Sequence, residues 1–306
     1  MVIVDLGLAV LSLVVLSVAA SQFITGAARI ATLLGASPLF IGAVLLGVGT
    51  SLPDGLVAVF AAANDQGGLA LGNVIGSNTF NISVVLGAGA VIVPVAIAVG
   101  TLKREALISA AAVALFLAFA IIGLGTVTGL VLLALVPLAF WLIRDNPPDS
   151  SEAVADEGMS VGLEIARALL GLIFTVAASR LLVDSAGSLA TEAGVSEAVV
   201  GLTLVAVGTS LPELAVSIQA ALKNELDLMV GNVLGSNLIN SLLIGGAIAL
   251  ISPTTIEIGT LAAAGWLMMG LVVIATFFLA TGRTLVRWEG WTLIGIYIAA
   301  TVVVSL

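Results

Sequence analysis

Two carboxylates lie inside otherwise apolar stretches of the chain, and each directly follows a proline: Asp54 follows Pro53, and Glu213 follows Pro212. A charge at the centre of a membrane span costs at least about 2.5–3.5 kcal/mol on insertion scales, so such residues usually serve function. No Lys or Arg lies near either acid in the sequence. We therefore interpret the two acids as candidate cation ligands rather than as members of structural ion pairs.

The prolines predict broken helices at both acids. Proline cannot donate a hydrogen bond to the carbonyl four residues earlier, and its ring pushes against that carbonyl. Carbonyls around 47–49 and 206–208 should therefore be freed. Unwound carbonyls at membrane depth persist only where something coordinates them. A carboxylate, free carbonyls and a Thr-Ser pair within one turn would form an oxygen cage for a cation.

Hydroxyl and amide side chains recur four residues apart, the spacing that places two residues on one face of a helix. The resulting site has two carboxylates, two Asn oxygens, at least four hydroxyls and backbone carbonyls. Two negative charges suit one Ca²⁺ or several Na⁺ in alternation, whereas Mg²⁺ fits less well because it loses water reluctantly and demands an octahedron. The spaced pairs are Thr50 with Asp54, Thr209 with Glu213, Ser77 with Asn81, and Ser236 with Asn240.

Other polar or small residues in these segments have two possible roles. Ser51 and Ser210 could ligate an ion or cap the second half of a broken helix. Asn73 and Asn232 could hydrogen-bond to the backbone or touch ions. Glycines four residues apart favour close helix packing over ligation; these are Gly72 with Gly76 and Gly231 with Gly235.

The sequence contains an internal repeat. Residues 49–54 (GTSLPD) recur as 208–213 (GTSLPE), and residues 72–78 (GNVIGSN) recur as 231–237 (GNVLGSN). Every pair has the same offset of 159 residues, without a gap. A match of this length at one offset indicates duplication.

The composition indicates a polytopic membrane protein. Of the 306 residues, 60% are hydrophobic and only 9% charged, whereas soluble domains carry about 25% charged residues. This excludes a soluble enzyme, a nucleic-acid binder and a disordered protein. The absence of Cys and His removes the usual zinc ligands and leaves oxygen ligands, which favour hard cations.

We expect an all-α membrane protein of ten transmembrane helices. An acidic linker, 144–160, joins a first repeat, 1–143, to a second, 161–306. Because each repeat holds five spans, an odd number, the second must enter the membrane from the opposite side, giving two inverted five-helix repeats with Pro-broken helices at the ion site. The expected spans are 3–34, 37–63, 69–97, 104–122, 127–143, 161–188, 196–222, 228–250, 258–280 and 287–305.

The positive charges predict the orientation. With both termini outside the cell and the linker in the cytoplasm, eight of the nine basic residues lie at or near cytoplasmic ends, as membrane proteins prefer. The exception is Arg180, which lies inside the sixth span four residues before Asp184 and is expected to pair with it. The eight are Arg29, Lys103, Arg104, Arg144, Arg167, Lys223, Arg283 and Arg287.

The twice-repeated motifs Gly-Thr-Ser-Leu-Pro-acid and Gly-Asn-x-x-Gly-Ser-Asn resemble the two alpha-repeats of the sodium/calcium exchanger family, prokaryotic type. The resemblance covers the whole chain and implies exchange of Na⁺ for Ca²⁺ across the plasma membrane by alternating access, with spans one and six sliding across a core that holds the ions. It implies carbonyl ligands for Na⁺ at Gly47 and Ala206. The side-chain ligands it implies are Asp54, Glu213, Thr50, Ser51, Ser77, Asn81, Thr209, Ser210, Ser236 and Asn240.

Two positions depart from the family pattern. The first motif usually ends in Glu, and Asp54 is shorter by one methylene. Position 240 is Asp in many prokaryotic and potassium-dependent relatives and is Asn here. Proton/calcium antiporters resemble the chain less, because they place Glu where Gly76 and Gly235 stand.

Three other functions are alternatives. A transporter of the same fold could exchange a different ion pair, either H⁺ for Ca²⁺ or a K⁺-dependent set. An intramembrane aspartyl hydrolase would need two Asp that share a proton. Here the two intramembrane acids are an Asp and a Glu, and the sequence has no GxGD motif. A non-catalytic scaffold would not need oxygen ligands repeated at midplane. The expected partners are therefore Ca²⁺, Na⁺ and the lipid bilayer, with no resident cofactor and no nucleic acid; the oligomeric state is open.

Overall fold

The computed structural model describes residues 2–95, 99–144, 160–192, 207–253, 255, 260–281 and 284–305. Throughout these ranges the chain is helical apart from its turns and has no β-strand; one isolated bridge pairs Val95 with Leu285. In the same ranges, seven helical spans are long and apolar enough to cross a membrane. They are Val4–Leu34, Gly67–Ile92, Arg104–Ile122, Thr126–Ile143, Val161–Ala186, Leu226–Ile251 and Leu261–Leu279.

The other three expected spans are seen in different degrees. The second is a bent pair, Pro38–Thr50 and Leu52–Ala63, whose axes differ by 47°; counted as one span it is an eighth. The seventh is represented by its second part, α11 (Leu211–Leu222), because 193–206 lie outside the described residues. The tenth coincides with α15 (Arg287–Ser305), a helix that is not among the seven. The all-helical membrane architecture is confirmed, and the number ten stays a prediction.

The duplication is visible in the helix bounds. Helix α4 (Leu52–Ala63) and α11 lie 159 residues apart at both ends, as do α6 (Leu86–Ile92) and α13 (Gly245–Ile251). Helices α5 (Gly67–Phe80) and α12 (Leu226–Leu238) begin at the same offset. The turns that precede them contain Asp65 and Asn224, both with φ of 59°. The repeat therefore extends from sequence motifs to helix and turn positions.

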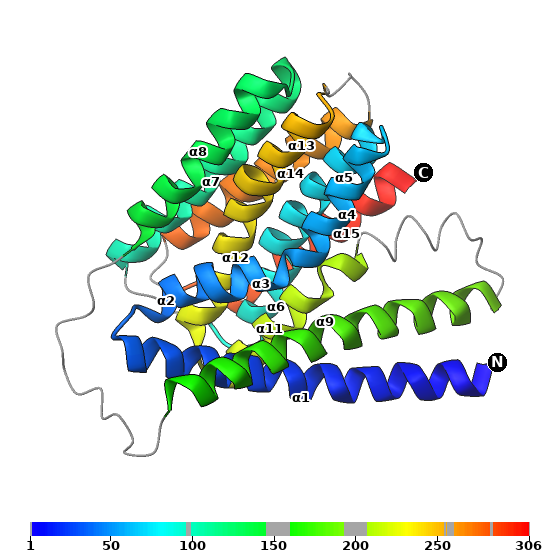
Figure 1. Cartoon of the computed structure of the whole chain (residues 1–306), viewed down its shortest axis with the longest axis vertical. Coiled ribbons are helices and arrows are strands. Elements are labelled where there is room, and N and C mark those ends of the chain that lie inside the picture. Colours follow the sequence, from blue (N-terminus) through cyan, green and yellow to red (C-terminus); the bar gives the residue numbers. More distant parts are fainter. Residues whose placement is uncertain are drawn as a thin grey trace.

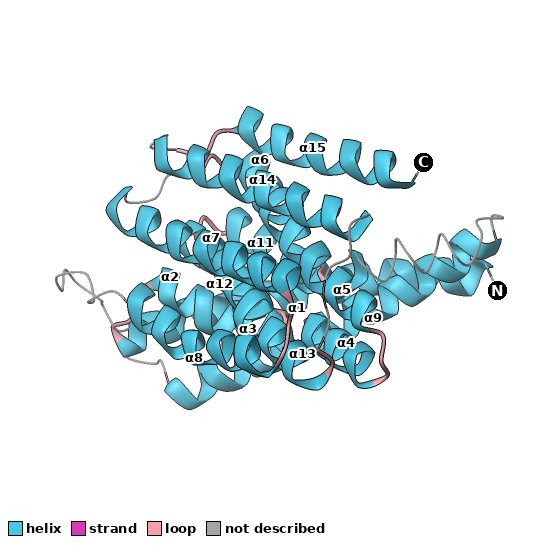
Figure 2. Ribbon diagram, turned by 90° about the horizontal axis from the view of Figure 1, so that it is seen from above, coloured by secondary structure: helices cyan, strands magenta, loops and turns pink. Residues whose placement is uncertain are grey.

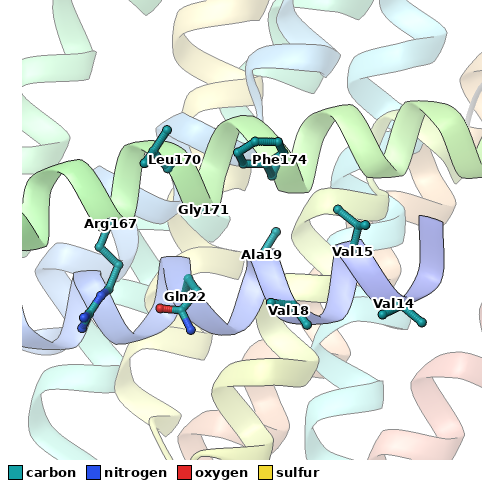
Figure 3. Close-up of a pocket in the computed structure, with 9 residues that line it drawn as sticks. All are labelled: Val14, Val15, Val18, Ala19, Gln22, Arg167, Leu170, Gly171 and Phe174. Atoms are coloured by element: carbon teal, nitrogen blue, oxygen red, sulfur yellow. The ribbon is translucent and has the colours of Figure 1, made fainter. Parts of the chain in front are cut away.

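Two long helices, α1 (Val2–Leu34) and α9 (Val161–Glu192), lie side by side along one edge of the molecule (Figures 1 and 2). A Cβ at Gly171 would come within 2.6 Å of the Phe23 backbone nitrogen, so glycine is needed for this approach. A cavity of about 410 Å³ between them is lined almost entirely by apolar side chains, with Arg167 at one end (Figure 3). Nearby, the buried Glu164 carboxylate pairs with Arg29 at 2.9 Å and with Arg167 at 3.1 Å.

Helix α12 lies at the centre of the core and packs closely on α2 (Pro38–Ile41) and on the π-helical turn η1 (Gly42–Leu46). A Cβ at Gly231 would lie 2.2 Å from the Leu39 oxygen, and one at Gly235 2.4 Å from the Ala43 oxygen. The predicted close packing is therefore confirmed for this glycine pair. The segment expected to pack on Gly72 and Gly76 corresponds to α2 and η1 shifted by 159 residues. It falls in 196–206, outside the described residues.

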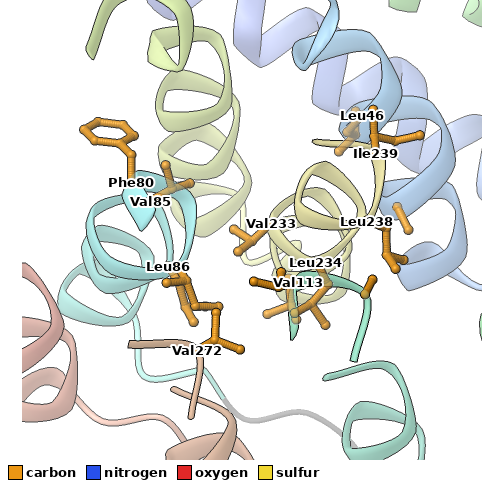
Figure 4. Close-up of a cluster of buried hydrophobic side chains, with 14 of the residues drawn as sticks. Leu46, Phe80, Val85, Leu86, Val113, Val233, Leu234, Leu238, Ile239 and Val272 are labelled. Carbon is orange, nitrogen blue, oxygen red and sulfur yellow. The ribbon is translucent and has the colours of Figure 1, made fainter. Parts of the chain in front are cut away.

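Apolar side chains fill the space around α12. Val233, Leu234 and Leu238 on this helix lie among Leu46, Val113 and other buried residues (Figure 4). Three long helices flank this core: α7 (Val99–Ile122), α8 (Thr126–Ile143) and α14 (Thr260–Thr281). Helix α8 packs on α13, α14 packs on α5 and α7, and α15 packs on α6. These helices surround α4, α5, α11 and α12, which carry the candidate residues.

Candidate cation site

Each candidate carboxylate lies one turn after a break in its helix. Ser51 separates α3 (Gly47–Thr50) from α4, and Ser210 precedes α11. Their backbone angles, φ −78° with ψ 0° and φ −99° with ψ 8°, fall in the sparsely populated bridge region where many active-site residues lie. Pro53 and Pro212 are the second residues of the new helices, where a missing N–H does no harm. The breaks expected from the prolines are thus present.

The two serines reach across to the opposite acid. Neither caps its own helix through its side chain, which removes the capping interpretation. Instead, the Ser51 hydroxyl donates to Glu213 Oε1 at 3.1 Å, and the Ser210 hydroxyl donates to Asp54 Oδ1 at 3.5 Å. Residues from one half of the sequence therefore complete the surroundings of the acid in the other half.

Most of the other candidate side chains converge on the same two acids. Both carboxyl groups are fully buried. Asn240 Nδ2 lies 3.5 Å from Asp54 Oδ2. Thr209 and Ser77 also lie beside Asp54, and Thr50 lies beside Glu213. Nothing in the described part of the chain forms an ion pair with either acid.

Several buried oxygens of this cluster have no hydrogen-bond partner among the described residues. They include Glu213 Oε2, Asn240 Oδ1 and Asn81 Oδ1, and the amide nitrogen of Asn81 is also unpartnered. Most buried polar atoms in proteins are hydrogen-bonded, so a concentration of unsatisfied oxygens at one place needs an explanation. A bound cation would supply it, because each of the three oxygens carries lone pairs suited to Na⁺ or Ca²⁺.

Asn73 and Asn232 hold the backbone of the acid-bearing helices. Asn73 Nδ2 donates to the Asp54 carbonyl at 2.9 Å, and Asn232 Nδ2 approaches the Glu213 carbonyl at 3.4 Å. The backbone-bonding alternative is therefore the one seen. Asn232 also donates to the Ser217 hydroxyl at 3.1 Å. Sequence reasoning missed Ser217 because it has no counterpart in the repeat, although it lies four residues after Glu213 on the same helix face.

The backbone carbonyls agree less well with expectation. The Gly47 carbonyl accepts the Ser51 N–H at 3.2 Å and the Ser236 hydroxyl at 3.4 Å, so the break does not leave it open. The Ser51 N–H is the ordinary helical donor to this oxygen, and Pro53 removes only the donor to the Gly49 carbonyl. Ala206 lies outside the described residues.

The helices that carry the asparagines are locally widened. Asn81 begins a π-helical turn, η2 (Asn81–Val85), and Asn240 lies in another, η3 (Ile239–Ile244). Single π-helical turns inside α-helices are frequent at functional sites. They were not predicted from the sequence.

The donor set resembles that of a site for hard, weakly held cations. Across the described residues, three or more Asp, Glu, His or Cys side chains nowhere gather in a metal-binding group. The cluster combines two carboxylates with neutral hydroxyl and amide oxygens, which suits Na⁺ and Ca²⁺ rather than a tightly held transition metal.

Comparisons with known proteins agree with this architecture. The family model for sodium/calcium exchanger proteins matches residues 4–143 and 163–306. An uncharacterised membrane protein of Methanocaldococcus jannaschii is 34% identical over 98% of both chains. A sodium/calcium exchanger of Methanosarcina acetivorans is 29% identical over 99% of both.

A solved structure shares the fold. The sodium-calcium exchanger NCX_Mj, soaked with 10 mM Na⁺ and no Ca²⁺, superposes with a TM-score of 0.86 and 31% identity, covering 99% of each chain. The chain therefore belongs to the sodium/calcium exchanger family of membrane cation antiporters.

Proposed function

We propose that the protein exchanges Na⁺ for Ca²⁺ across the plasma membrane by alternating access. The ions bind near midplane, between the two halves of the chain. The observation that carries this proposal is the pair of buried acids, Asp54 and Glu213, each bonded by the serine of the other half and surrounded by unsatisfied amide and carboxylate oxygens. Family membership supports antiport of this class.

The proposed ligands are the two acids, the side chains beside them, and the buried Asn81 and Ser236. Hydroxyl and amide groups from both halves surround the carboxylates. The two negative charges can neutralise one divalent ion, and monovalent ions can bind in turn to the surrounding oxygens. The Gly47 and Ala206 carbonyls would join Na⁺ sites, which for Gly47 requires rearrangement of the Ser51 turn. The side chains are Thr50, Ser51, Asp54, Ser77, Asn81, Thr209, Ser210, Glu213, Ser236 and Asn240.

The two halves, 1–143 and 161–306, form inverted five-helix repeats in this proposal, with the linker 144–160 in the cytoplasm and both termini outside. The coincident bounds of α4 with α11 and of α6 with α13 support the repeat. The orientation is supported by the distribution of basic residues. The Arg29–Glu164–Arg167 cluster gathers two of the eight at one end of the α1–α9 pair.

The direct test is uptake of ⁴⁵Ca²⁺ into proteoliposomes that are loaded with Na⁺ and diluted into Na⁺-free buffer, with K⁺ and pH varied separately. Rapid uptake that requires the outward Na⁺ gradient is the expected result. Uptake driven by a pH gradient at equal Na⁺ would replace the proposal with H⁺/Ca²⁺ exchange, and an absolute need for K⁺ would replace it with K⁺-dependent exchange. No uptake under any gradient would refute calcium antiport.

A further inference from the structure

A second cavity, of about 330 Å³, lies directly beside the candidate cation site. One wall consists of residues at the two helix breaks, among them Pro53, Thr209 and Pro212. The other wall is the face of α9 that carries Ser179, Arg180 and Asp184. The cavity has room for about ten water molecules, enough for a cation that keeps most of its hydration shell.

Most of the cavity lining is apolar, including Leu56, Val57 and Val183, but the charges on α9 indicate an aqueous environment at the end where they lie. Arg180 and Asp184 form the ion pair predicted from their spacing, with Nε and Oδ2 3.2 Å apart. Their side chains are 77% and 56% exposed, although they lie within an apolar helix. Exposed charges of this kind do not face hydrocarbon; they face protein or water. The cavity therefore opens to an aqueous phase, which in the proposed orientation is the outside of the cell.

Oxygen atoms lead from this opening to the buried acids. Ser179 lines the cavity and is 2% exposed, and its buried hydroxyl has no hydrogen-bond partner among the described residues. Thr209 lines the cavity as well and lies beside Asp54. An arriving cation would thus meet the exposed Asp184 carboxylate before it passes Ser179 and Thr209 on the way to Asp54.

We propose that Asp184 is an outer docking carboxylate for the incoming cation and that Arg180 competes with the cation for it. This inference rests on the proposed function. A cation can use Asp184 only by displacing the guanidinium, so the pair lowers the affinity of the entrance and limits how long an ion stays there. Because low-dielectric walls focus the field in a cleft, one charge at this position affects ion capture more than a charge elsewhere on the outer surface.

The test measures initial ⁴⁵Ca²⁺ uptake against external Ca²⁺ in sealed, Na⁺-loaded vesicles. In right-side-out vesicles, Asp184→Asn should raise the KM for Ca²⁺ about two- to fivefold, and Arg180→Gln should lower it by a similar factor, as expected for an exposed ion pair. The maximal rate should stay unchanged and the double variant should return near the parent KM. Both shifts should shrink when choline chloride is added, because salt screens exposed charges.

The matched control is Asp65→Asn, which removes a charge from an exposed turn that does not line the cavity; its KM should equal that of the parent. In inside-out vesicles neither Asp184→Asn nor Arg180→Gln should change the KM. If Asp184→Asn and Arg180→Gln leave the KM unchanged in right-side-out vesicles, or shift it in the same direction, this inference is wrong. Loss of transport in Glu213→Gln would still support the proposed function. An active Glu213→Gln variant would instead refute the proposed site.

Discussion

Glu213→Gln tests the role of the second carboxylate because it keeps the shape of the side chain and removes its charge. The Ser51 hydroxyl can still donate to the amide oxygen that replaces Glu213 Oε1. Two buried carboxylates supply the negative charge of the proposed site, and the variant leaves one. Removing one partner of a buried ion pair typically costs about 3–5 kcal/mol. For Ca²⁺ this corresponds to an affinity loss of about two to four orders of magnitude.

The loss should depend on the charge of the ion. Coulomb energy scales with the product of the charges, so a bound Na⁺ should lose about half as much, roughly 1.5–2.5 kcal/mol. That is about one to two orders of magnitude in Na⁺ affinity. The variant should therefore lose Ca²⁺ transport and shift its preference toward Na⁺, whereas misfolding would abolish both without discrimination.

Thermal unfolding of the detergent-solubilised protein provides a readout besides transport. At a Ca²⁺ concentration 100 times its dissociation constant, the parent should gain about 2.7 kcal/mol in the free energy of unfolding. A variant with 100-fold weaker binding should gain only about 0.4 kcal/mol at that concentration. Without Ca²⁺ the variant should unfold at a higher temperature than the parent, because it no longer buries a second uncompensated anion near Asp54.

The control is Glu192→Gln, the same substitution at an exposed residue near the end of α9. It should show the parent's Ca²⁺-dependent stabilisation and flux. If Glu213→Gln keeps either the full Ca²⁺ stabilisation or near-normal Na⁺-driven Ca²⁺ flux, the reasoning that makes Glu213 a ligand is wrong.

Four further variants test separate parts of the structure. Asp54→Glu should shorten the two 3.5 Å contacts of this acid and lower the KM for Ca²⁺ several-fold; a higher KM would show that the shorter acid is matched to its site. Asn240→Asp adds a third acid, and three close carboxylates cannot all stay ionised without a large energetic cost. Na⁺-driven Ca²⁺ flux should therefore become dependent on pH between about 6 and 9 or sensitive to K⁺. Flux profiles identical to those of the parent would show that this residue is not in the ion path. Gly235→Ala places a Cβ 2.4 Å from a backbone oxygen of η1 and should destabilise the protein by about 1–3 kcal/mol in thermal unfolding, whereas Gly295→Ala, which meets nothing within 4 Å, should not. Ser150→Cys, introduced into a chain without cysteine, should resist an impermeant thiol reagent in intact cells and react after permeabilisation; labelling of intact cells would reverse the orientation.

The sequence was sufficient to locate the two buried acids, because each repeat carries one. A buried acid after a proline is rare and costly, so Asp54 and Glu213 could be found without a structure. Helical spacing also predicted the Arg180–Asp184 pair, which the structure confirms. Composition predicted the long apolar helices, because a chain that spans hydrocarbon has few alternatives to a helix.

Other parts of the site could not be predicted, because they depend on contacts between distant segments. Ser217 has no repeated counterpart, since position 58 is alanine. The contact from Asn78 Nδ2 to the Ser241 hydroxyl, 2.9 Å long, likewise pairs a repeated residue with an unrepeated one. The π-helical turns at Asn81 and Asn240 and the satisfied Gly47 carbonyl follow from the way whole helices pack, which spacing along the chain does not encode.

The exchange of serine hydroxyls between halves has an evolutionary consequence. Ser51 donates a hydrogen bond to Glu213, and Ser210 donates one to Asp54, so each duplicated segment supplies a hydroxyl to the acid of the other segment. After such an exchange neither segment can change independently, because loss of the hydroxyl in one segment removes a hydrogen bond to the carboxylate of the other. A gene cut within the region encoding the linker would therefore yield two fragments that are inactive singly and regain transport only when co-expressed. Selection then acts on the two duplicated segments together.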